Sequence, residues 1–103
     1  MPTRDDIARM WDDHRKLPFP TRARGVEVGE VDLVLLDSLA SGCISSYTTG
    51  DGRLDPTKVE LLKDLARQLR RVESELDSST THYFAQLSAL ISAVLASANQ
   101  ASR

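Results

Sequence analysis

The stretch from Val31 to Tyr47 constrains the fold of this chain more than any other. It reads VDLVLLDSLASGCISSY, and its only charged residues are Asp32 and Asp37. Its apolar residues recur at steps of three and four and form two adjacent stripes: Leu33, Leu36, Ala40, Cys43 and Tyr47, and beside them Leu35, Leu39, Cys43 and Ile44. A helix that is apolar around most of its circumference is typical of a buried position. We therefore expect a buried central helix here.

Three other stretches show helical patterns. Thr3 can cap a first helix that ends near Lys16, because Pro18 disfavours helical geometry in the residue before it. Asp55 and Pro56 are a favourable start for a strongly amphipathic helix, and a polar break separates that helix from the last one. The 103 residues therefore predict an all-α, four-helix, bundle-like single domain, with helices at about 3–16, 31–49, 56–77 and 81–98.

The connection between the first two helices, residues 17–30, is long for so small a domain. Phe19 stands between two prolines and is the expected anchor into the core. Val26 and Val28 alternate with polar residues, which is typical of a short strand. A connection of this length is usually packed down, functional or disordered. We expect this one to be ordered and packed against the bundle.

The composition limits the classes of function. The chain is 27% charged and 41% hydrophobic, as a globular domain is, and its net charge of -2 gives no general attraction to nucleic acid or anionic membranes. The last helix is too rich in serine to be a membrane span. The N-terminal residues contain no apolar signal segment. These features favour a cytoplasmic protein.

No residue pattern predicts catalysis, a cofactor or a metal. Cys43 is the single cysteine and lies on the apolar stripe, so a buried reduced thiol is expected. The segment from Gly50 to Asp55 is similar to the middle of an EF-hand calcium loop, but Lys58 then occupies the last ligand position, where a glutamate is required. An enzyme would need a polar pocket, for example one lined by Asp37, Cys43 and His82. We expect neither enzymatic activity nor a cofactor.

The third predicted helix carries a basic face. Its members are Lys63, Arg67, Arg70 and Arg71, which fall close together at helical spacing. Such a face can bind the phosphates of nucleic acid. Acidic neighbours dilute it, and no aromatic residue accompanies it, so a solvated or protein-contacting face is the preferred interpretation. A nucleic-acid-associated regulator remains the alternative function.

The last predicted helix has no charged residue between His82 and Arg103. Its core face is apolar, and its other face consists of small side chains, including Ser88, Ala89, Ser92, Ala93 and Ala96. A second uncharged face indicates a second covered side, which another copy of the chain could cover. We therefore expect a small protein-interaction module, an adaptor, regulator or accessory subunit, that forms a homo-oligomer such as a homodimer through this face.

Four features extend over most of the chain: Pro18-Phe19-Pro20, the run from Val31 to Cys43, Leu54-Asp55 and Tyr83-Phe84. In these features the chain resembles small helical actinobacterial proteins of unknown function. The resemblance implies no particular activity.

Overall fold

The computed structural model describes residues 3–23, 27–50 and 52–101. Over these residues the chain forms four helices, as predicted: α1 (Arg4–Arg15), α2 (Leu33–Thr49), α3 (Pro56–Val72) and α4 (Ser78–Ala101). The shorter elements are the 3-10 turns η1 (Thr21–Ala23) and η2 (Glu73–Glu75) and the strands β1 (Glu27–Val28) and β2 (Val31–Asp32). The predicted all-α, bundle-like class is confirmed.

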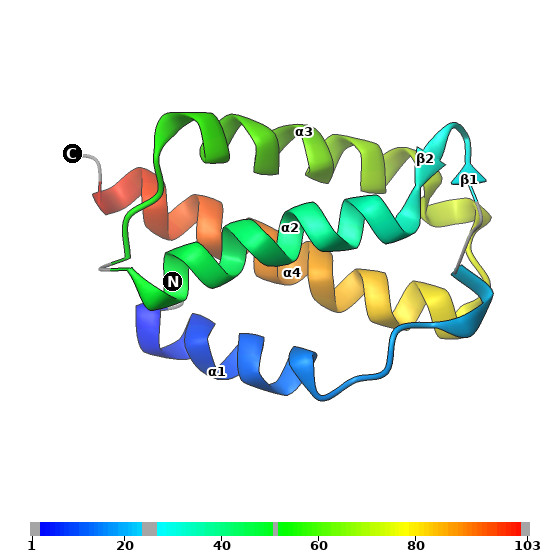
Figure 1. Cartoon of the computed structure of the whole chain (residues 1–103), viewed down its shortest axis with the longest axis horizontal. Helices are drawn as coiled ribbons and strands as arrows, with labels where there is room; N and C mark the ends of the chain where they lie inside the picture. The colour runs from blue at the N-terminus through cyan, green and yellow to red at the C-terminus, as the bar shows by residue number, and fades with distance from the viewer. Residues whose placement is uncertain (1–2, 24–26, 51, 102–103) are drawn as a thin grey trace.

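Each helix runs opposite to the one before it along the chain (Figure 1). In this view α2 lies in front of α4, with α3 along one side of the pair and α1 along the other. Both α2 and α4 contact all three other helices. The bundle measures 38 × 25 × 20 Å. Its centre is therefore the interface between α2 and α4.

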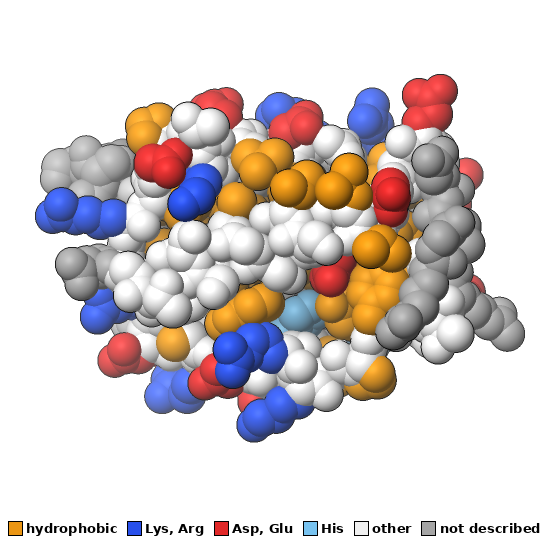
Figure 2. Space-filling model, in the orientation of Figure 1, with side chains coloured by type: hydrophobic (Ala, Val, Ile, Leu, Met, Phe, Trp, Pro, Cys, Tyr) orange, Lys and Arg blue, Asp and Glu red, His pale blue; other side chains and the backbone are white. Residues whose placement is uncertain are grey.

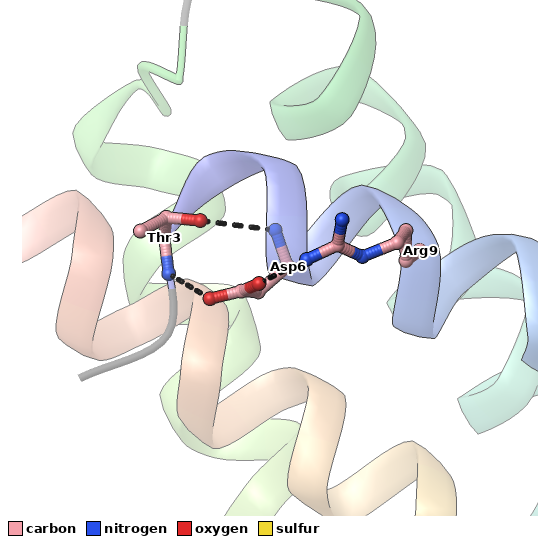
Figure 3. Close-up of polar contacts among 3 residues, drawn as sticks. All are labelled: Thr3, Asp6 and Arg9. Carbon is pink, nitrogen blue, oxygen red and sulfur yellow. Dashed lines mark hydrogen bonds and ion pairs between the residues drawn. The ribbon is translucent and has the colours of Figure 1, made fainter.

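The first helix begins with a reciprocal cap (Figure 3). Thr3 Oγ1 accepts a 3.1 Å hydrogen bond from the Asp6 amide, and Asp6 Oδ2 accepts one of 2.9 Å from the Thr3 amide. This capping box satisfies two amides that have no partner inside the helix. The hydrogen bonds from Thr3, together with an ion pair to Arg9, lower the pKa of Asp6. The predicted start of the first helix at Thr3 is thus confirmed as a cap.

Four boundaries differ from the predicted ones by two residues or more, and one of them is the end of the last helix, which lies at Ala101 and not near 98. Residues 31–32 form β2, so the second helix begins at Leu33, capped by Asp32. The third helix ends at Val72, because the next three residues tighten into the 3-10 turn η2 and Leu76 is extended. The last helix begins at Ser78 rather than near 81, because Asp77 Oδ1 accepts a 2.8 Å hydrogen bond from the Thr80 amide and so acts as the cap.

The second helix is buried on one side only, which corrects the expectation of a helix buried around most of its circumference. One predicted stripe faces the core: Leu33, Leu36, Ala40, Cys43 and Tyr47 are all buried. The adjacent stripe is buried only at its end, at Cys43 and Ile44, whereas Leu35 and Leu39 are exposed together with Val34. The physical reason is that α4 covers one side of α2 and α1 and α3 flank it, which leaves its outer side open.

The long connection is anchored as expected where it is described. Phe19 packs edge-on against Tyr83 and Phe84 of α4, with ring centroids 5.4 and 6.1 Å apart. Gly29 and Glu30 both have positive φ, 52° and 70°, and form the two-residue turn of a hairpin that pairs Val28 with Val31. The predicted strand therefore exists at Val28, and Val26 lies outside the described residues.

Candidate interaction surface

A groove with leucines in its lining and an acidic rim runs between α2 and α3. We call it the α2–α3 groove. Its lining residues are Glu30, Asp32, Leu35, Leu36, Leu39, Leu61, Asp64, Leu65 and Gln68. Figure 2 shows hydrophobic side chains gathered along this seam, with a band free of charged side chains on α2 beside them. Leu35, Leu39 and Leu61 are the leucines of the lining that are not fully buried, and they can pack against an apolar surface of a partner.

The second feature of this surface is the exposure of large hydrophobic side chains on α2. Among the described residues, the large hydrophobic side chains that are exposed all lie on α2: Leu35 at 55%, Val34 at 40% and Leu39 at 38%. Isolated exposed leucines are common on protein surfaces, whereas a contiguous apolar patch marks an interaction site. Here Leu35 and Leu39 line the groove together with the half-buried Leu61 of α3, whereas Val34 is not part of its lining. This continuity makes the groove the leading candidate surface.

The charges that line the groove are all acidic. Glu30 and Asp32 lie at the start of α2, and Asp64 lies on α3. Asp64 accepts a 2.7 Å hydrogen bond from Gln68, and an Arg67 guanidinium nitrogen lies 3.6 Å from its carboxylate. The negative rim therefore favours a partner that brings positive charge.

The opposite end of the same face carries a cation. Lys58, at the start of α3, lies 3.4 Å from the Ser46 hydroxyl on α2 and 3.8 Å from the Asp55 carboxylate. Its side chain is 43% exposed, so the ammonium remains accessible. The face therefore runs from an acidic end to an end that includes a lysine.

The predicted basic face exists on α3 and is partly neutralised. Arg67, Arg70 and Arg71 line one shallow hollow together with Asp64. Lys63 lies 3.4 Å from Glu60. The structure thus brings the four predicted cations to one side of α3. Two of the four have a carboxylate within ion-pair distance, which weakens their attraction for phosphate.

The residues of the predicted self-association face on α4 do not form one continuous exposed surface. Ala93 is buried in the core of the bundle and is unavailable to another chain. Ser88 lines a hollow toward α3, and Ala89 lines a separate hollow toward α1. Ser92 is exposed and Ala96 is half-buried. The small side chains of this helix serve mainly to let α4 pack between its neighbours.

A polar cluster lies where α1, α2 and α4 meet. The Tyr83 hydroxyl donates a 2.8 Å hydrogen bond to Asp37 Oδ1. The His14 ring packs on the Tyr83 ring with centroids 4.5 Å apart, and its Nδ1 lies 3.5 Å from Oε1 of Gln86. His14 is buried, and its Nε2 has no hydrogen-bond partner. Gln86 in turn lies 3.5 Å from Nε2 of the exposed His82.

Burial shifts the pKa values in this cluster toward neutral side chains. Burial lowers the pKa of His14, and burial raises the pKa of Asp37 against the opposing effect of the Tyr83 hydrogen bond. Burial and the Asp37 carboxylate together raise the pKa of Tyr83. A buried imidazole and a carboxyl group with shifted pKa values can mark a catalytic site. Here the His14 ring packs against Trp11 and Tyr83, and its Nε2 is buried. His14 also lines a hollow between α1 and α4, whose other lining residues are Met10, Asp13, Gln86, Ala89 and Leu90.

The three residues considered for an enzyme site have separate surroundings. Asp37 belongs to the polar cluster, and His82 contacts that cluster only through Gln86. Cys43 is buried, and burial raises the pKa of its thiol, so the reactive thiolate is disfavoured. Over the described part of the chain, no three His, Cys, Asp or Glu side chains converge as a metal site requires.

Sequence reasoning missed both the groove and the polar cluster. The groove has a signal in the sequence, since Leu35 and Leu39 lie on a stripe of their own, but periodicity alone predicts the same burial for both stripes. The cluster has only a partial signal, because His14, Asp37 and Tyr83 are far apart in the sequence and meet only through tertiary packing. Asp37 was the one charge inside the apolar stretch, and a buried charge needs a partner.

Comparison with protein-family models, with curated proteins and with solved structures finds no match to this chain. Within residues 3–23, 27–50 and 52–101, no helix combines the length and the apolar content that crossing a bilayer requires. The surface of the molecule is therefore the main source of evidence on its function.

Proposed function

We propose that this chain is a small protein-interaction domain, an adaptor, regulator or accessory subunit, that docks through the α2–α3 groove. The observation that carries the proposal is the exposure of Leu35 and Leu39, which line the groove on one side of a single helix. Leaving apolar surface in water costs about 25 cal/mol per Å² of that surface. Covering these side chains with a partner would recover that free energy.

The electrostatics of the groove support a protein partner over a nucleic acid. Glu30, Asp32 and Asp64 would repel phosphates, whereas Lys or Arg side chains of a protein can pair with them. The apolar floor with a charged rim is the usual arrangement of a protein interface. The groove therefore has the composition of a docking site for a folded or helical partner.

The test is capture of proteins from a lysate of the source organism on the immobilised chain. The double variant Leu35→Gln, Leu39→Gln removes the exposed leucines of the groove. The matched control, Ala89→Gln with Ser92→Gln, changes two exposed positions of α4. We expect a specific protein, which can be this chain itself, to be lost from the groove variant and retained by the α4 variant. Equal recovery by both variants would contradict the proposal, provided that circular dichroism shows both to be helical.

The second candidate is a nucleic-acid-associated regulator that uses the basic face of α3. Three arginines line one hollow there, which is the observation in its favour. This function predicts binding that weakens steeply as salt concentration rises and that drops when Arg67 and Arg70 are changed to glutamate. The absence of any mobility shift with labelled DNA or RNA at low salt would remove this candidate.

A further inference from the structure

We infer that the partner seated on the α2–α3 groove is a second copy of this chain, with the two α2 helices antiparallel about a twofold axis near Ser38. The inference rests on the proposed function and names the occupant of the same surface. It follows from shape and charge along one face of α2.

The shape is self-complementary. Leu35 is the most exposed large hydrophobic side chain of the described residues, at 55%. Gly42 lies two helical turns further along on the same face, and a Cβ added there would meet nothing within 4 Å. A twofold axis midway between them places Leu35 of each copy over Gly42 of the other. In such an isologous interface each contact is made twice.

The charges fit the same axis. It places Asp32 of one copy opposite Ser45 and Ser46 of the other, where Lys58 reaches across to α2. The acidic start of each α2 therefore meets the end of the partner's α2 that is contacted by Lys58 of α3, whose ammonium also lies 3.8 Å from the Asp55 carboxylate. The antiparallel arrangement also sets the positive N-terminal end of each helix dipole beside the negative C-terminal end of the other.

The middle of the face suits the centre of an interface. The exposed residues around the axis, Leu35, Ser38, Leu39 and Gly42, are uncharged, and charges are depleted at interface centres. A basic amphipathic helix from another protein would match the acidic rim. It would leave the open surface at Gly42 and the Lys58 end of the face unused. The second copy uses both halves of α2, so the observations favour it.

The first experiment measures mass by sedimentation at about 100 µM, where an interface with micromolar affinity is filled. We expect wild type to be a dimer and Gly42→Leu to be a monomer at the same concentration, because the added side chain occupies the position of Leu35 from the other copy. The variant's side chain meets no atom of its own chain at the Cβ, so it should fold. Gly42→Ala serves as the milder second variant and should weaken the dimer less.

The second experiment locates the axis by cross-linking. Ser38→Cys places a thiol near the axis, and Ser92→Cys places one at an exposed position of α4. Disulfides form where the Cα atoms come within about 4.4–6.8 Å of each other. Under mild oxidation we expect the Ser38→Cys chain to form covalent dimers about tenfold faster than the Ser92→Cys chain, since pairing raises the local thiol concentration. Wild type, whose Cys43 is buried, is the unreactive control.

The outcomes separate the two proposals. A wild-type monomer at about 100 µM, or equally fast cross-linking of both cysteine variants, overturns the second copy as occupant. If the chain is a monomer and the groove variant still loses a captured protein of different sequence, the proposed function stands and this inference falls. If the chain is a dimer that Gly42→Leu does not disturb, the groove is not the dimer contact.

Discussion

The hydroxyl of Tyr83 on α4 donates a 2.8 Å hydrogen bond to the carboxylate of Asp37 on α2, and so joins the two helices that meet at the centre of the bundle. Tyr83 is only 8% exposed, so water cannot readily replace it as a donor. A hydrogen bond to a charged group stabilises a fold by about 1.5–3 kcal/mol. This contact is therefore expected to matter more than an ordinary neutral hydrogen bond.

Replacing Tyr83 by phenylalanine should lower the free energy of unfolding by about 1.5–3 kcal/mol at pH 8, because Asp37 loses its donor while it remains half-buried. The measurement is urea unfolding followed by circular dichroism. The matched control is Tyr47→Phe, which removes a hydrogen bond between two neutral hydroxyls, those of Tyr47 and Ser97, and should cost about 0.5–1.5 kcal/mol. If Tyr83→Phe lowers the free energy of unfolding no more than Tyr47→Phe does, the charge of the Asp37 carboxylate does not strengthen this hydrogen bond.

The raised pKa of Asp37 gives a definite pH dependence. The pKa of Asp37 is higher in the folded state than in the unfolded state, so the folded state binds the proton more tightly. The stability that this proton binding provides is lost as pH rises through the pKa of the folded state. Asp37→Asn has no proton to lose. The unfolding free energy of the variant relative to wild type should therefore increase between pH 4 and pH 8. Asp12→Asn on the exposed side of α1 leaves Asp37 in place and should show no such trend.

The helices could be predicted from the sequence because their information is local. Residues at steps of three and four, and caps such as Thr3 and Asp55, determine where a helix starts and which side is apolar. Several residues between 77 and 81 are of a type that can cap the last helix. Asp77 is the cap in the structure, because it accepts the hydrogen bond of the Thr80 amide. Periodicity cannot make that choice, which is why the last helix begins earlier than predicted.

The functional surface depends on information that is not local. A stripe of leucines is the same in sequence whether a neighbouring helix covers it or not. Leu36 and Leu35 differ only in that the first faces α4 and the core, whereas the second points to the open side of α2. The sequence predicts self-association through the uncharged face of α4 and not through the outer face of α2. Only the packing of Ala93 into the core and the exposure of Leu35 separate them.

His14 should make the protein less stable in mild acid. Its folded pKa is lowered by burial, so the unfolded state binds the proton more readily, and stability falls as pH drops from the unfolded value of 6.5 through the folded pKa. His14→Phe keeps an aromatic ring against Trp11 and Tyr83 and removes the buried nitrogen that has no partner.

We expect urea unfolding of His14→Phe to lose the decline in stability that wild type shows below pH 6.5. His82→Gln, at an exposed position on α4, leaves His14 in place and should retain the decline. A decline that persists in His14→Phe would mean that another group, not His14, takes up the proton on unfolding. In that case, NMR titration of wild type would show that the pKa of the His14 imidazole is not lowered from the ordinary value of a histidine.

Gly42→Ala separates the stability of one chain from the stability of the pair. A glycine inside a helix costs about 0.5–1 kcal/mol relative to alanine, and the added methyl group at this position meets nothing within 4 Å. At low micromolar concentration, the free energy of unfolding of the variant should therefore exceed that of wild type by about 0.5–1 kcal/mol. The variant should accordingly unfold at a higher urea concentration. At high concentration the same methyl group should weaken the dimer, because it lies where Leu35 of the second copy is seated. If Gly42→Ala stabilises the chain equally at both concentrations, the outer face of α2 is open to solvent in the assembled protein as well, and the second copy must sit elsewhere.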